Sequence, residues 1–228
     1  MKTTYFVTGT DTEVGKTFIS AALLYALNNN GINAVGLKPV AAGCERQQGQ
    51  WKNEDALILQ QASPMDLPYD TVNPIALPDA IAPHLAAEKL GSTLSVNSMI
   101  EALQEGLGVA SDLTLIEGAG GWYVPLNDAE FFSDFAVTLS LPVILVVGLR
   151  LGCINHALLT EAAIKQAGLP LVGWVANCID PNMSSVAENI RTLKNTIDAP
   201  CLGVVPYLPS ALPQEAVGCL DVETLARV

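Results

Sequence analysis

Apolar positions follow two different spacings along this chain. Short apolar runs with the length of buried strands occur at residues 4–7, 34–37, 113–116, 142–147, 171–176 and 201–205. Between them, apolar residues recur with the period of an α-helix, which predicts helices over residues 17–29, 96–107, 154–167 and 185–197. Alternating strands and helices are typical of parallel sheets with crossover helices. The pattern therefore predicts an α/β fold with a doubly wound, mostly parallel sheet and helices on both faces.

Glycine and proline mark the limits of these elements. Gly31 and Gly168 follow two of the predicted helices, at positions suited to helix C-caps. Between residues 44 and 95, long elements are interrupted by Pro64, Pro68, Pro74, Pro78 and Pro83. We therefore expect only a short helix near residues 55–61 in this segment. It is too apolar for a disordered linker, so we expect it to help build the functional site.

Composition limits the possible partners and the compartment. The 228 residues are 50% hydrophobic and 15% charged, which is enough for one domain with a substantial core, and we expect a single P-loop α/β domain over residues 1–228. A net charge of −12 argues against a nucleic-acid partner. No apolar signal segment precedes the first strand, and the apolar run at 141–149 is about half of a bilayer span. We expect a cytoplasmic protein with no membrane partner.

Cysteine usage indicates neither a disulfide framework nor a zinc site. The number of cysteines is odd, no C-x-x-C pair is present, and the chain has only two histidines. We expect reduced, partly buried thiols at Cys44, Cys153, Cys178, Cys201 and Cys219.

The residues after the first predicted strand, 9–17, read GTDTEVGKT and resemble a phosphate-binding loop. Gly15 allows the backbone to approach phosphate closely, Lys16 supplies an ammonium, and the hydroxyl of Thr17 can ligate Mg²⁺. Five residues separate Gly9 from Gly15 where the usual spacing is four, so this is a variant P-loop. The alternative is a chance Gly-Lys-Thr at a helix start. The preceding strand and following amphipathic helix favour phosphate binding.

Polar or glycine-rich residues follow most of the predicted strands, at residues 38–43, 117–121, 148–152, 177 and 206–208. We expect them to meet at the carboxyl edge of the sheet. Glu117 ends a strand within reach of a metal held by the P-loop hydroxyl. Lys38 ends another strand and is directed either at the phosphates or into solvent. For Asp55, a metal-site role and a helix N-terminal role favoured by the helix dipole remain open.

Together these motifs resemble the dethiobiotin synthetase family, ATP-dependent enzymes that close the ureido ring in biotin synthesis. The resemblance extends over nearly the whole chain and rests on residues 5–17 (YFVTGTDTEVGKT), 36–40 (GLKPV), 53–57 (NEDAL), 117–122 (EGAGGW), 152–157 (GCINHA) and 173–177 (GWVAN). Each motif alone would be suggestive, whereas their combination is specific.

The resemblance implies that 7,8-diaminopelargonate and CO₂ form dethiobiotin, through a carbamate and a carbamic–phosphoric anhydride. ATP is the co-substrate, Mg²⁺ is the cofactor, and the protein is a homodimer whose substrate site lies at the subunit boundary. By the same resemblance, Lys38, Lys16 and Thr12 are catalytic, and the metal residues are Thr17, Asp55 and Glu117.

The resemblance also implies two sets of binding residues. The nucleotide is bound by Glu13, Val14, Gly15, Lys16, Thr17, Phe18, Asp55, Glu117, Gly118, Ala119, Gly120, Asn177, Cys178, Pro206, Tyr207 and Leu208. The substrate is bound by Ala42, Gly152, Cys153, Ile154 and Asn155. Independently of the resemblance, Gly152 precedes a predicted helix whose first N–H groups would attract a carboxylate. A simple helix cap is the alternative.

Two departures from related patterns affect the interpretation. The family commonly has Lys-Pro-Val-Ala-Ser-Gly after the catalytic lysine, whereas this chain has Ala42 where the serine would donate a hydrogen bond. The missing hydroxyl implies weaker carbamate binding, a substitute donor elsewhere in the site, or a paralogue that acts on another substrate.

Nucleotide-switched regulators of the partitioning or metallochaperone type share the fold, but they carry a lysine where this chain has Asp11. A corrinoid amidotransferase-type synthetase would need a glutaminase domain, for which 228 residues leave no space.

Overall fold

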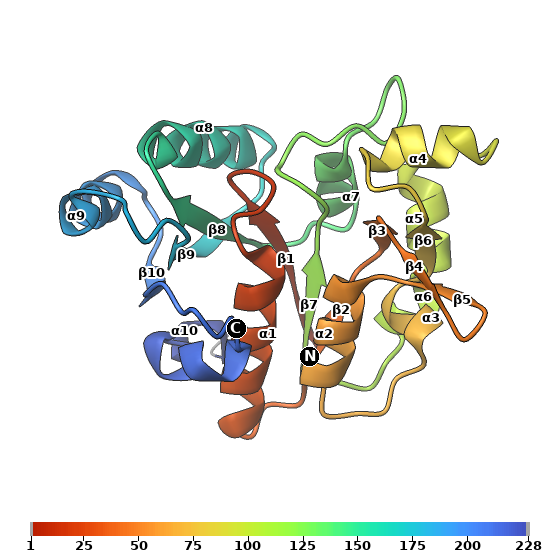
Figure 1. The fold of residues 1–228 in the computed structure, drawn as a ribbon, viewed down its shortest axis with the longest axis horizontal. Coiled ribbons are helices and arrows are strands. Elements are labelled where there is room, and N and C mark those ends of the chain that lie inside the picture. Colours follow the sequence, from red (N-terminus) through yellow and green to blue (C-terminus); the bar gives the residue numbers. More distant parts are fainter. Residues whose placement is uncertain (1, 227–228) are drawn as a thin grey trace.

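The computed structural model describes residues 2–226 and shows a central sheet of parallel strands (Figure 1). The strand order is β10-β9-β8-β1-β7-β2. The strands are β1 (Thr3–Gly9), β2 (Ala34–Leu37), β7 (Leu113–Glu117), β8 (Val143–Leu149), β9 (Leu171–Cys178) and β10 (Cys201–Val205). All six predicted strands occur, and each adjacent pair is parallel. The predicted parallel α/β sheet is therefore confirmed.

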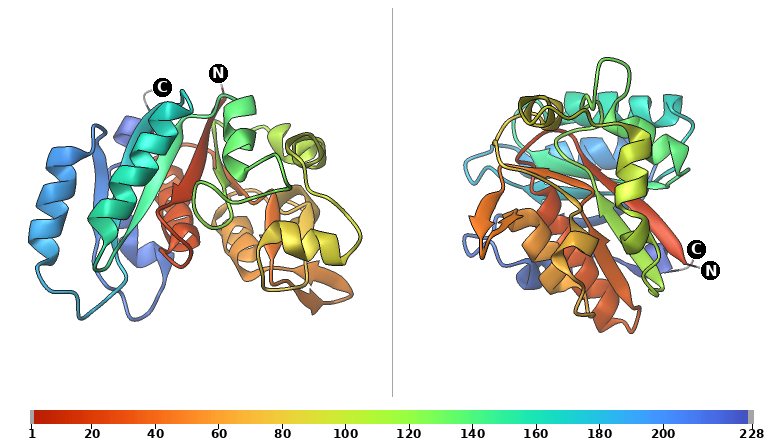
Figure 2. Two further views of the ribbon diagram at one scale, coloured as in Figure 1. Left: turned by 90° about the horizontal axis from the view of Figure 1, so that it is seen from above. Right: turned by 90° about the vertical axis from the view of Figure 1, so that its right-hand side faces the viewer.

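Helices cover both faces of this sheet (Figures 1 and 2). One face is covered by α1 (Lys16–Asn29), α2 (Glu54–Ala62), the 3₁₀ helix η1 (Pro213–Cys219) and α10 (Glu223–Ala226). The other is covered by α5 (Val96–Ala102), α7 (Phe132–Thr138), α8 (Cys153–Gln166) and α9 (Val186–Thr196). None of the helices within residues 2–226 has the length and apolar character needed to cross a membrane. All five cysteines are free thiols.

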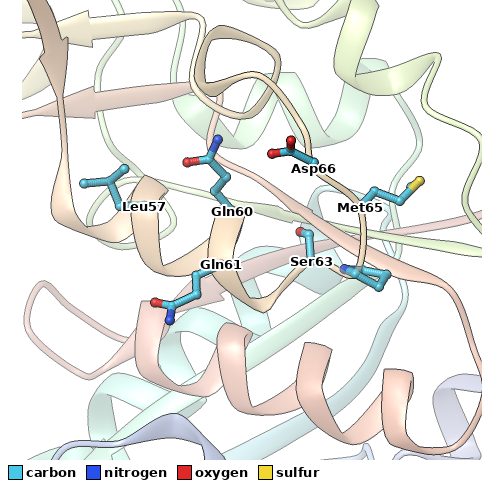
Figure 3. A pocket seen from close by; sticks show the side chains of 7 residues that line it. Leu57, Gln60, Gln61, Ser63, Met65 and Asp66 are labelled. Atoms are coloured by element: carbon cyan, nitrogen blue, oxygen red, sulfur yellow. The ribbon is translucent and has the colours of Figure 1, made fainter. Parts of the chain in front are cut away.

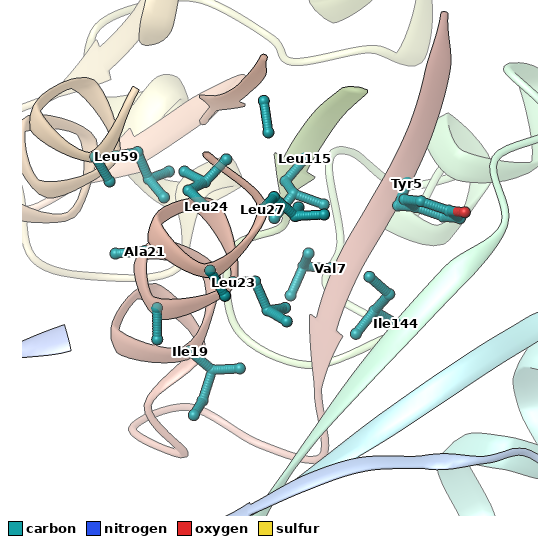
Figure 4. Packing of buried hydrophobic residues seen from close by; sticks show 14 of the residues in the cluster. Tyr5, Val7, Ile19, Ala21, Leu23, Leu24, Leu27, Leu59, Leu115 and Ile144 are labelled. Atoms are coloured by element: carbon teal, nitrogen blue, oxygen red, sulfur yellow. The ribbon is translucent and has the colours of Figure 1, made fainter. Parts of the chain in front are cut away.

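The alternation of side chains along β1 anchors this strand on both faces. Tyr5 and Val7 belong to the core on the α1 side (Figure 4). Phe6 points to the opposite face, where its ring centroid lies 5.7 Å from that of Phe132 and 6.4 Å from that of Phe135. Because both faces of β1 are fully buried, the loop that follows it starts from a firmly packed position.

Four strands extend further than the sequence pattern predicted, and β1, predicted over residues 4–7, is one of them. Glu117, Gly148 and Asn177 were expected in the connections that follow β7, β8 and β9, but they lie within these strands. The reason is continued pairing, since Glu117 lies opposite Val7 in the adjacent strand and Gly148 lies opposite Asn177. The side chains of Glu117 and Asn177 are therefore placed by the sheet and not by flexible connections.

The helix predicted over residues 96–107 is interrupted at Leu103. The structure shows α5 (Val96–Ala102) followed by the short α6 (Gln104–Leu107). In α6, Gly106 packs so closely on the neighbouring chain that a Cβ would lie 2.7 Å from the carbonyl oxygen of Thr71. The helix therefore breaks close to a tight contact with another segment. The spacing of apolar residues in the sequence gives no sign of that contact.

The segment from residue 44 to 95 contains more regular structure than expected. The short helix predicted near residues 55–61 is present as α2. The additional elements are β4 (Glu45–Gln47), β5 (Gln50–Lys52), α3 (Tyr69–Val72), β6 (Ile75–Leu77) and α4 (Pro83–Lys89), and the unpredicted strand β3 (Val40–Ala42) lies just before the segment. β3 pairs with β6, and β4 forms a hairpin with β5. Elements this short show no recognisable spacing of apolar residues in the sequence. Whether they form depends on pairing with segments that are distant in the chain.

Candidate active site

The connection from β1 to α1 has the geometry of a phosphate-binding loop. Gly15 precedes α1 with a left-handed φ of 81°, and a Cβ at this position would collide with the side-chain amide of Asn177. The Nζ of Lys16 donates to the carbonyl oxygen of Asp11 at 3.3 Å. No side chain caps the start of α1, so its first N–H groups are left for an anion.

Lys38, Asp55 and Glu117 form an ion-pair cluster beside this loop, called the Lys38 cluster below. The Nζ of Lys38 lies 2.6 Å from Oδ2 of Asp55 and 2.6 Å from Oε1 of Glu117. Lys38 is 4% exposed and Glu117 is fully buried, so the alternative of a solvated surface lysine is wrong. Pairing of β2 with β7 brings Lys38 and Glu117 together across 79 residues of sequence.

Charge interactions in the Lys38 cluster outweigh the effect of burial. Burial alone would lower the pKa of Lys38, but the negative charges of Glu117 and Asp55 raise it above its ordinary value. Burial would likewise raise the pKa of Asp55, whereas Lys38 holds it below the usual range. For Lys16, burial lowers the pKa although Glu117 opposes this shift. The site thus keeps Lys38 and Asp55 charged at neutral pH.

The start of α2 explains the position of Asp55. The N-cap of α2 is Asn53, whose side-chain oxygen accepts a hydrogen bond from the backbone N–H of Asp55 at 3.0 Å. Asp55 itself lies in the first helical turn, where the helix dipole favours a carboxylate, and it also reaches Lys38. The helix N-terminal position of Asp55 is therefore confirmed, whereas its metal-site role stays a prediction.

The donor set at the end of β7 fits Mg²⁺. The hydroxyl of Thr17 donates to Oε1 of Glu117 at 2.7 Å, whereas the buried Oε2 of Glu117 has no hydrogen-bond partner. An unpartnered carboxylate oxygen is costly in the interior, and oxygen is the ligand that Mg²⁺ prefers. Within residues 2–226 no group of three His, Cys, Asp or Glu side chains forms a metal cage. The remaining ligands would therefore be phosphate or water oxygens, as is usual for Mg²⁺.

A cavity of about 950 Å³, called the active-site cavity below, is lined by Lys16, Thr17, Lys38 and Asp55. Eleven of the predicted site residues line it: Thr12, Glu13, Gly15, Lys16, Thr17, Phe18, Lys38, Ala42, Asp55, Ala119 and Gly120. Ligand pockets typically measure about 300–1,000 Å³, so this cavity is at the upper end of that range.

The remaining predicted residues do not line the active-site cavity. Val14, Gly118 and Glu117 are buried behind it, and Asn177 is also buried and donates from Nδ2 to the carbonyl oxygen of Val14 at 3.0 Å. Cys178 ends β9, and residues 206–208 follow β10. The turn at 152–155 begins α8, with Gly152 in the left-handed N-cap position and Asn155 exposed. Glu117 and Asn177 still contact lining residues of the cavity, whereas the turn at 152–155 does not line it within one chain.

Several residues that line the active-site cavity were not predicted. Besides Ala41, Asn53, Glu54 and Ile58, they come from three connections: Ala80, Ile81, Ala82 and Pro83, then Tyr123, Val124 and Pro125, and finally Ala211 and Pro213. Most are small or apolar and carry no motif, so no local signal marked them. The clue available was indirect, since each of the three connections contains proline. The stretch after β10 therefore reaches the site through Ala211 and Pro213.

An ion pair between Asp11 and Arg150 was also not predicted. Oδ2 of Asp11 accepts from the guanidinium of Arg150, and Oδ1 accepts from the backbone N–H of Thr12 at 2.8 Å. Arg150 lies in the turn after β8, just before Gly152. The contact joins the P-loop to the start of α8. Both residues follow neighbouring parallel strands, and this was the feature of the sequence from which the ion pair could have been predicted.

A second depression lies beside α2, away from the P-loop (Figure 3). It has a volume of about 560 Å³ and is lined by Leu57, Gln60, Gln61, Ser63, Pro64, Met65 and Asp66. Among these described residues only Asp66 is charged. The depression thus lacks the convergent charges of the active-site cavity.

The strand order, the glycine loop between β1 and α1 and the acidic residue that ends the adjacent strand β7 define a P-loop α/β protein. A family model described as an AAA domain matches residues 3–215. The chain belongs to the ATP-dependent dethiobiotin synthetase family. It is 52% identical over 221 residues to ATP-dependent dethiobiotin synthetase BioD of Pseudomonas aeruginosa (strain LESB58), covering 97% of each chain. It is 51% identical over 224 residues to the protein of the same name from Cellvibrio japonicus, covering 98% of each.

Solved structures with much lower sequence identity share the fold. The septum site-determining protein MinD of Pyrococcus horikoshii, complexed with Mg-ADP, has a TM-score of 0.56 and 17% identity, covering 100% of this chain and 90% of that one. A ParA family ATPase from Chlorobium tepidum has a TM-score of 0.56 and 15% identity, covering 99% and 93%. At this identity the likeness concerns the fold alone.

Proposed function

We propose that this protein converts 7,8-diaminopelargonate, CO₂ and ATP to dethiobiotin, ADP and phosphate. Family membership supports this reaction at the level of the whole chain. The observation that carries the proposal at the site is the convergence of Lys16 and Lys38 on one cavity next to the P-loop. A reaction between a carbamate and a nucleotide γ-phosphate brings several negative charges together, and two fixed cations offset them.

The proposed chemistry has two stages. One amine of the substrate takes up CO₂ as a carbamate, whose oxygen attacks the γ-phosphorus of ATP while ADP leaves. The second amine then attacks the carbonyl carbon of the mixed anhydride, phosphate leaves, and the ring closes. Lys38 and Lys16 stabilise the charge of the carbamate and of the transferred phosphoryl group, and the hydroxyl of Thr12 contacts the carbamate. Positioning and electrostatics suffice, so no covalent bond to the protein is needed.

Thr17, Asp55 and Glu117 are proposed to hold Mg²⁺. The unpartnered Oε2 of Glu117 and the partly exposed carboxylate of Asp55 support this assignment. When bound, Mg²⁺ supplies charge neutralisation on the phosphate oxygens. The P-loop backbone from Glu13 to Phe18 and residues 118–120 would surround the phosphates.

The adenine is proposed to bind between the ends of β9 and β10. Asn177 lies directly behind the P-loop, where it contacts Val14. Val205, the last residue of β10, is paired with Asn177, so Pro206, Tyr207 and Leu208 continue from a neighbouring point on the same edge of the sheet. With Cys178, these residues would form the walls of a base pocket beside the phosphate site.

The carboxylate of the substrate is proposed to bind the turn from Gly152 to Asn155 of a second subunit, in a cytoplasmic homodimer. This turn opens a fourteen-residue helix without a side-chain cap, so its N–H groups are available to an anion. It does not line the active-site cavity of its own chain. The neighbouring Leu151 is 96% exposed and Leu159 is 62% exposed, which is consistent with a surface that another subunit covers.

Two observations bear on the alternative functions. Asp11, paired with Arg150, occupies the P-loop position where switch ATPases carry a lysine, and this argues against a regulatory ATPase. Ala42 lines the active-site cavity without a hydroxyl, which is the observation that favours a paralogue with another substrate.

The assay that tests the proposal incubates the protein with diaminopelargonate, labelled bicarbonate and MgATP and measures acid-stable label. We expect label incorporation that depends on both the diamine and ATP. Lys194→Ala, which changes an exposed lysine in the last turn of α9, away from the residues that line the cavity, is the control variant and should retain the rate. ATP turnover without the diamine and without label would instead indicate a regulatory ATPase. Label with another diamine alone would indicate a paralogue.

A further inference from the structure

A buried hydrogen-bond network lies behind the Lys38 cluster, in a segment without any of the motifs described above. Its centre is Tyr69 of α3, which is 5% exposed. The hydroxyl of Tyr69 accepts from the backbone N–H of Asn53 at 2.7 Å and donates to Oδ1 of Asn73 at 2.9 Å. Tyr69 does not line the active-site cavity, so the hydroxyl acts on the site only through these partners.

Asn73 connects this network to the backbone of Lys38. Asn73 is 1% exposed, and its Nδ2 donates to the carbonyl oxygen of Lys38 at 2.6 Å. The preceding residue, Val72, accepts from the backbone N–H of Lys38 at 2.8 Å. Both backbone polar groups of Lys38 are thus bound by two consecutive residues of one short segment.

Asn53 connects the same network to Asp55. The side-chain oxygen of Asn53 caps α2 by accepting from the N–H of Asp55, and its Nδ2 donates to the carbonyl oxygen of Ala42 at 3.1 Å. The hydroxyl of Tyr69 therefore lies between the backbone that carries Lys38 and the helix turn that carries Asp55. Lys38 and Asp55 are the two partners of the 2.6 Å ion pair.

We propose that Tyr69 and Asn73 are positioning residues for the reaction, setting the place of the Lys38 ammonium relative to Asp55. A lysine side chain has four rotatable bonds, so the position of its charge depends on how firmly its backbone is held. Buried, fully satisfied networks hold a single arrangement, because each lost partner leaves a polar group without water. This inference rests on the proposed function, since it assigns Lys38 a role in that reaction.

The first test compares Tyr69→Phe with Tyr5→Phe. Tyr5 is an equally buried tyrosine whose hydroxyl donates to the carbonyl oxygen of Leu225 at 3.0 Å, on the α10 side of the sheet. The two variants remove the same atom. For Tyr69→Phe we expect kcat to fall about tenfold with the KM for ATP changed less than about twofold, the size of one or two lost hydrogen bonds. For Tyr5→Phe we expect both parameters to stay within about twofold of the wild type.

The second test asks whether Tyr69 and Asn73 act through one route. Asn73→Ala should lower kcat by at least as much as Tyr69→Phe, and the double variant should be no slower than Asn73→Ala within about twofold. If the fall in kcat of the double variant equals the product of the two single falls, the residues act independently and a shared network is contradicted. An equal loss of kcat in Tyr69→Phe and Tyr5→Phe would show a general effect of a buried hydroxyl and overturn the proposal.

Backbone amide exchange separates this proposal from the proposed function. In Tyr69→Phe we expect faster exchange at Lys38 and Asn53, whereas Tyr5→Phe should leave these amides protected. Unchanged exchange at both sites in Tyr69→Phe would refute the positioning role even in an active protein. If the wild type forms no acid-stable label, the proposed reaction fails. The exchange data then still decide whether the network holds Lys38.

Discussion

The Nζ of Lys38 lies 2.6 Å from Oε1 of Glu117, in a pair that is 5% exposed at the lysine and fully buried at the glutamate. A buried pair of this kind contributes little net stability, but loss of one partner leaves an uncompensated charge. The geometry therefore links the chemistry of the site to the stability of the fold.

Lys38→Ala is expected to abolish most of the turnover while nucleotide affinity changes little, because the carbamate and the transferred phosphoryl group need this charge more than bound ATP does. The free energy of unfolding should fall by about 3 kcal/mol, the low end for a broken buried pair, since Lys16 also faces Glu117. Urea unfolding and nucleotide titration measure both effects. Adding Glu117→Gln to Lys38→Ala should recover part of the lost stability but none of the activity. If stability does not recover, Glu117 is not the buried charge left without a partner.

Asp55→Asn and Glu117→Gln are each expected to raise the Mg²⁺ concentration needed for half-maximal activity. Each substitution removes an anionic oxygen from the set proposed to hold the metal. The measurement is a Mg²⁺ titration at saturating ATP. Glu188→Gln, which removes an acidic side chain from the first turn of α9 and does not line the cavity, is the matched control for Asp55. An unchanged titration in Asp55→Asn would restrict Asp55 to the ion pair and the first turn of α2.

Ala42→Ser is expected to tighten binding of the diamine by up to about tenfold, the value of one hydrogen bond in a partly buried site. Ala42 lines the active-site cavity, so the added hydroxyl would face the reactants. Isothermal titration with the diamine in the presence of a non-hydrolysable ATP analogue measures the change. Weaker binding would indicate that the pocket is shaped for another substrate.

Tyr69 is expected to contribute to the alkaline limit of stability. Burial raises the pKa of Tyr69 to about 12, whereas a tyrosine in the unfolded chain titrates near pH 10. Between these values the unfolded state loses the proton that the folded state retains, so stability falls as the pH rises from about 10 to 12. Urea unfolding at several pH values should show that the advantage of the wild type over Tyr69→Phe shrinks across this range. A difference in unfolding free energy between wild type and Tyr69→Phe that stays constant over this pH range would contradict the raised pKa of Tyr69.

Mixed dimers test the proposed sharing of sites. Lys38→Ala and Asn155→Ala subunits should each be impaired alone, whereas a mixed dimer contains one site with both residues intact. We expect mixed dimers to recover up to about half of the wild-type activity. The measurement is the label assay after subunit exchange, with exchange verified by mass. No recovery would place the carboxylate site within a single chain.

Local sequence determined the main strands and indicated the candidate chemistry of this protein. Apolar runs predicted all six strands of the main sheet, and the GTDTEVGKT loop predicted the phosphate-binding connection. These features depend on neighbours in the chain, because side-chain period and glycine conformation act within a few residues. Lys38, Asp55 and Glu117 were singled out for the same reason, since each lies at the start or the end of a readable element.

Tertiary structure alone decided which of these residues meet. The Lys38 cluster forms because β2 pairs with β7, and the Asp11–Arg150 pair forms because β1 is flanked by β8. Neither strand order nor the short elements between residues 44 and 95 can be read from a local period. The positions of Tyr69 and Asn73 behind Lys38 depend on the same long-range packing. Sequence thus singled out the candidate groups of the site, whereas the order of the strands set the distances between them.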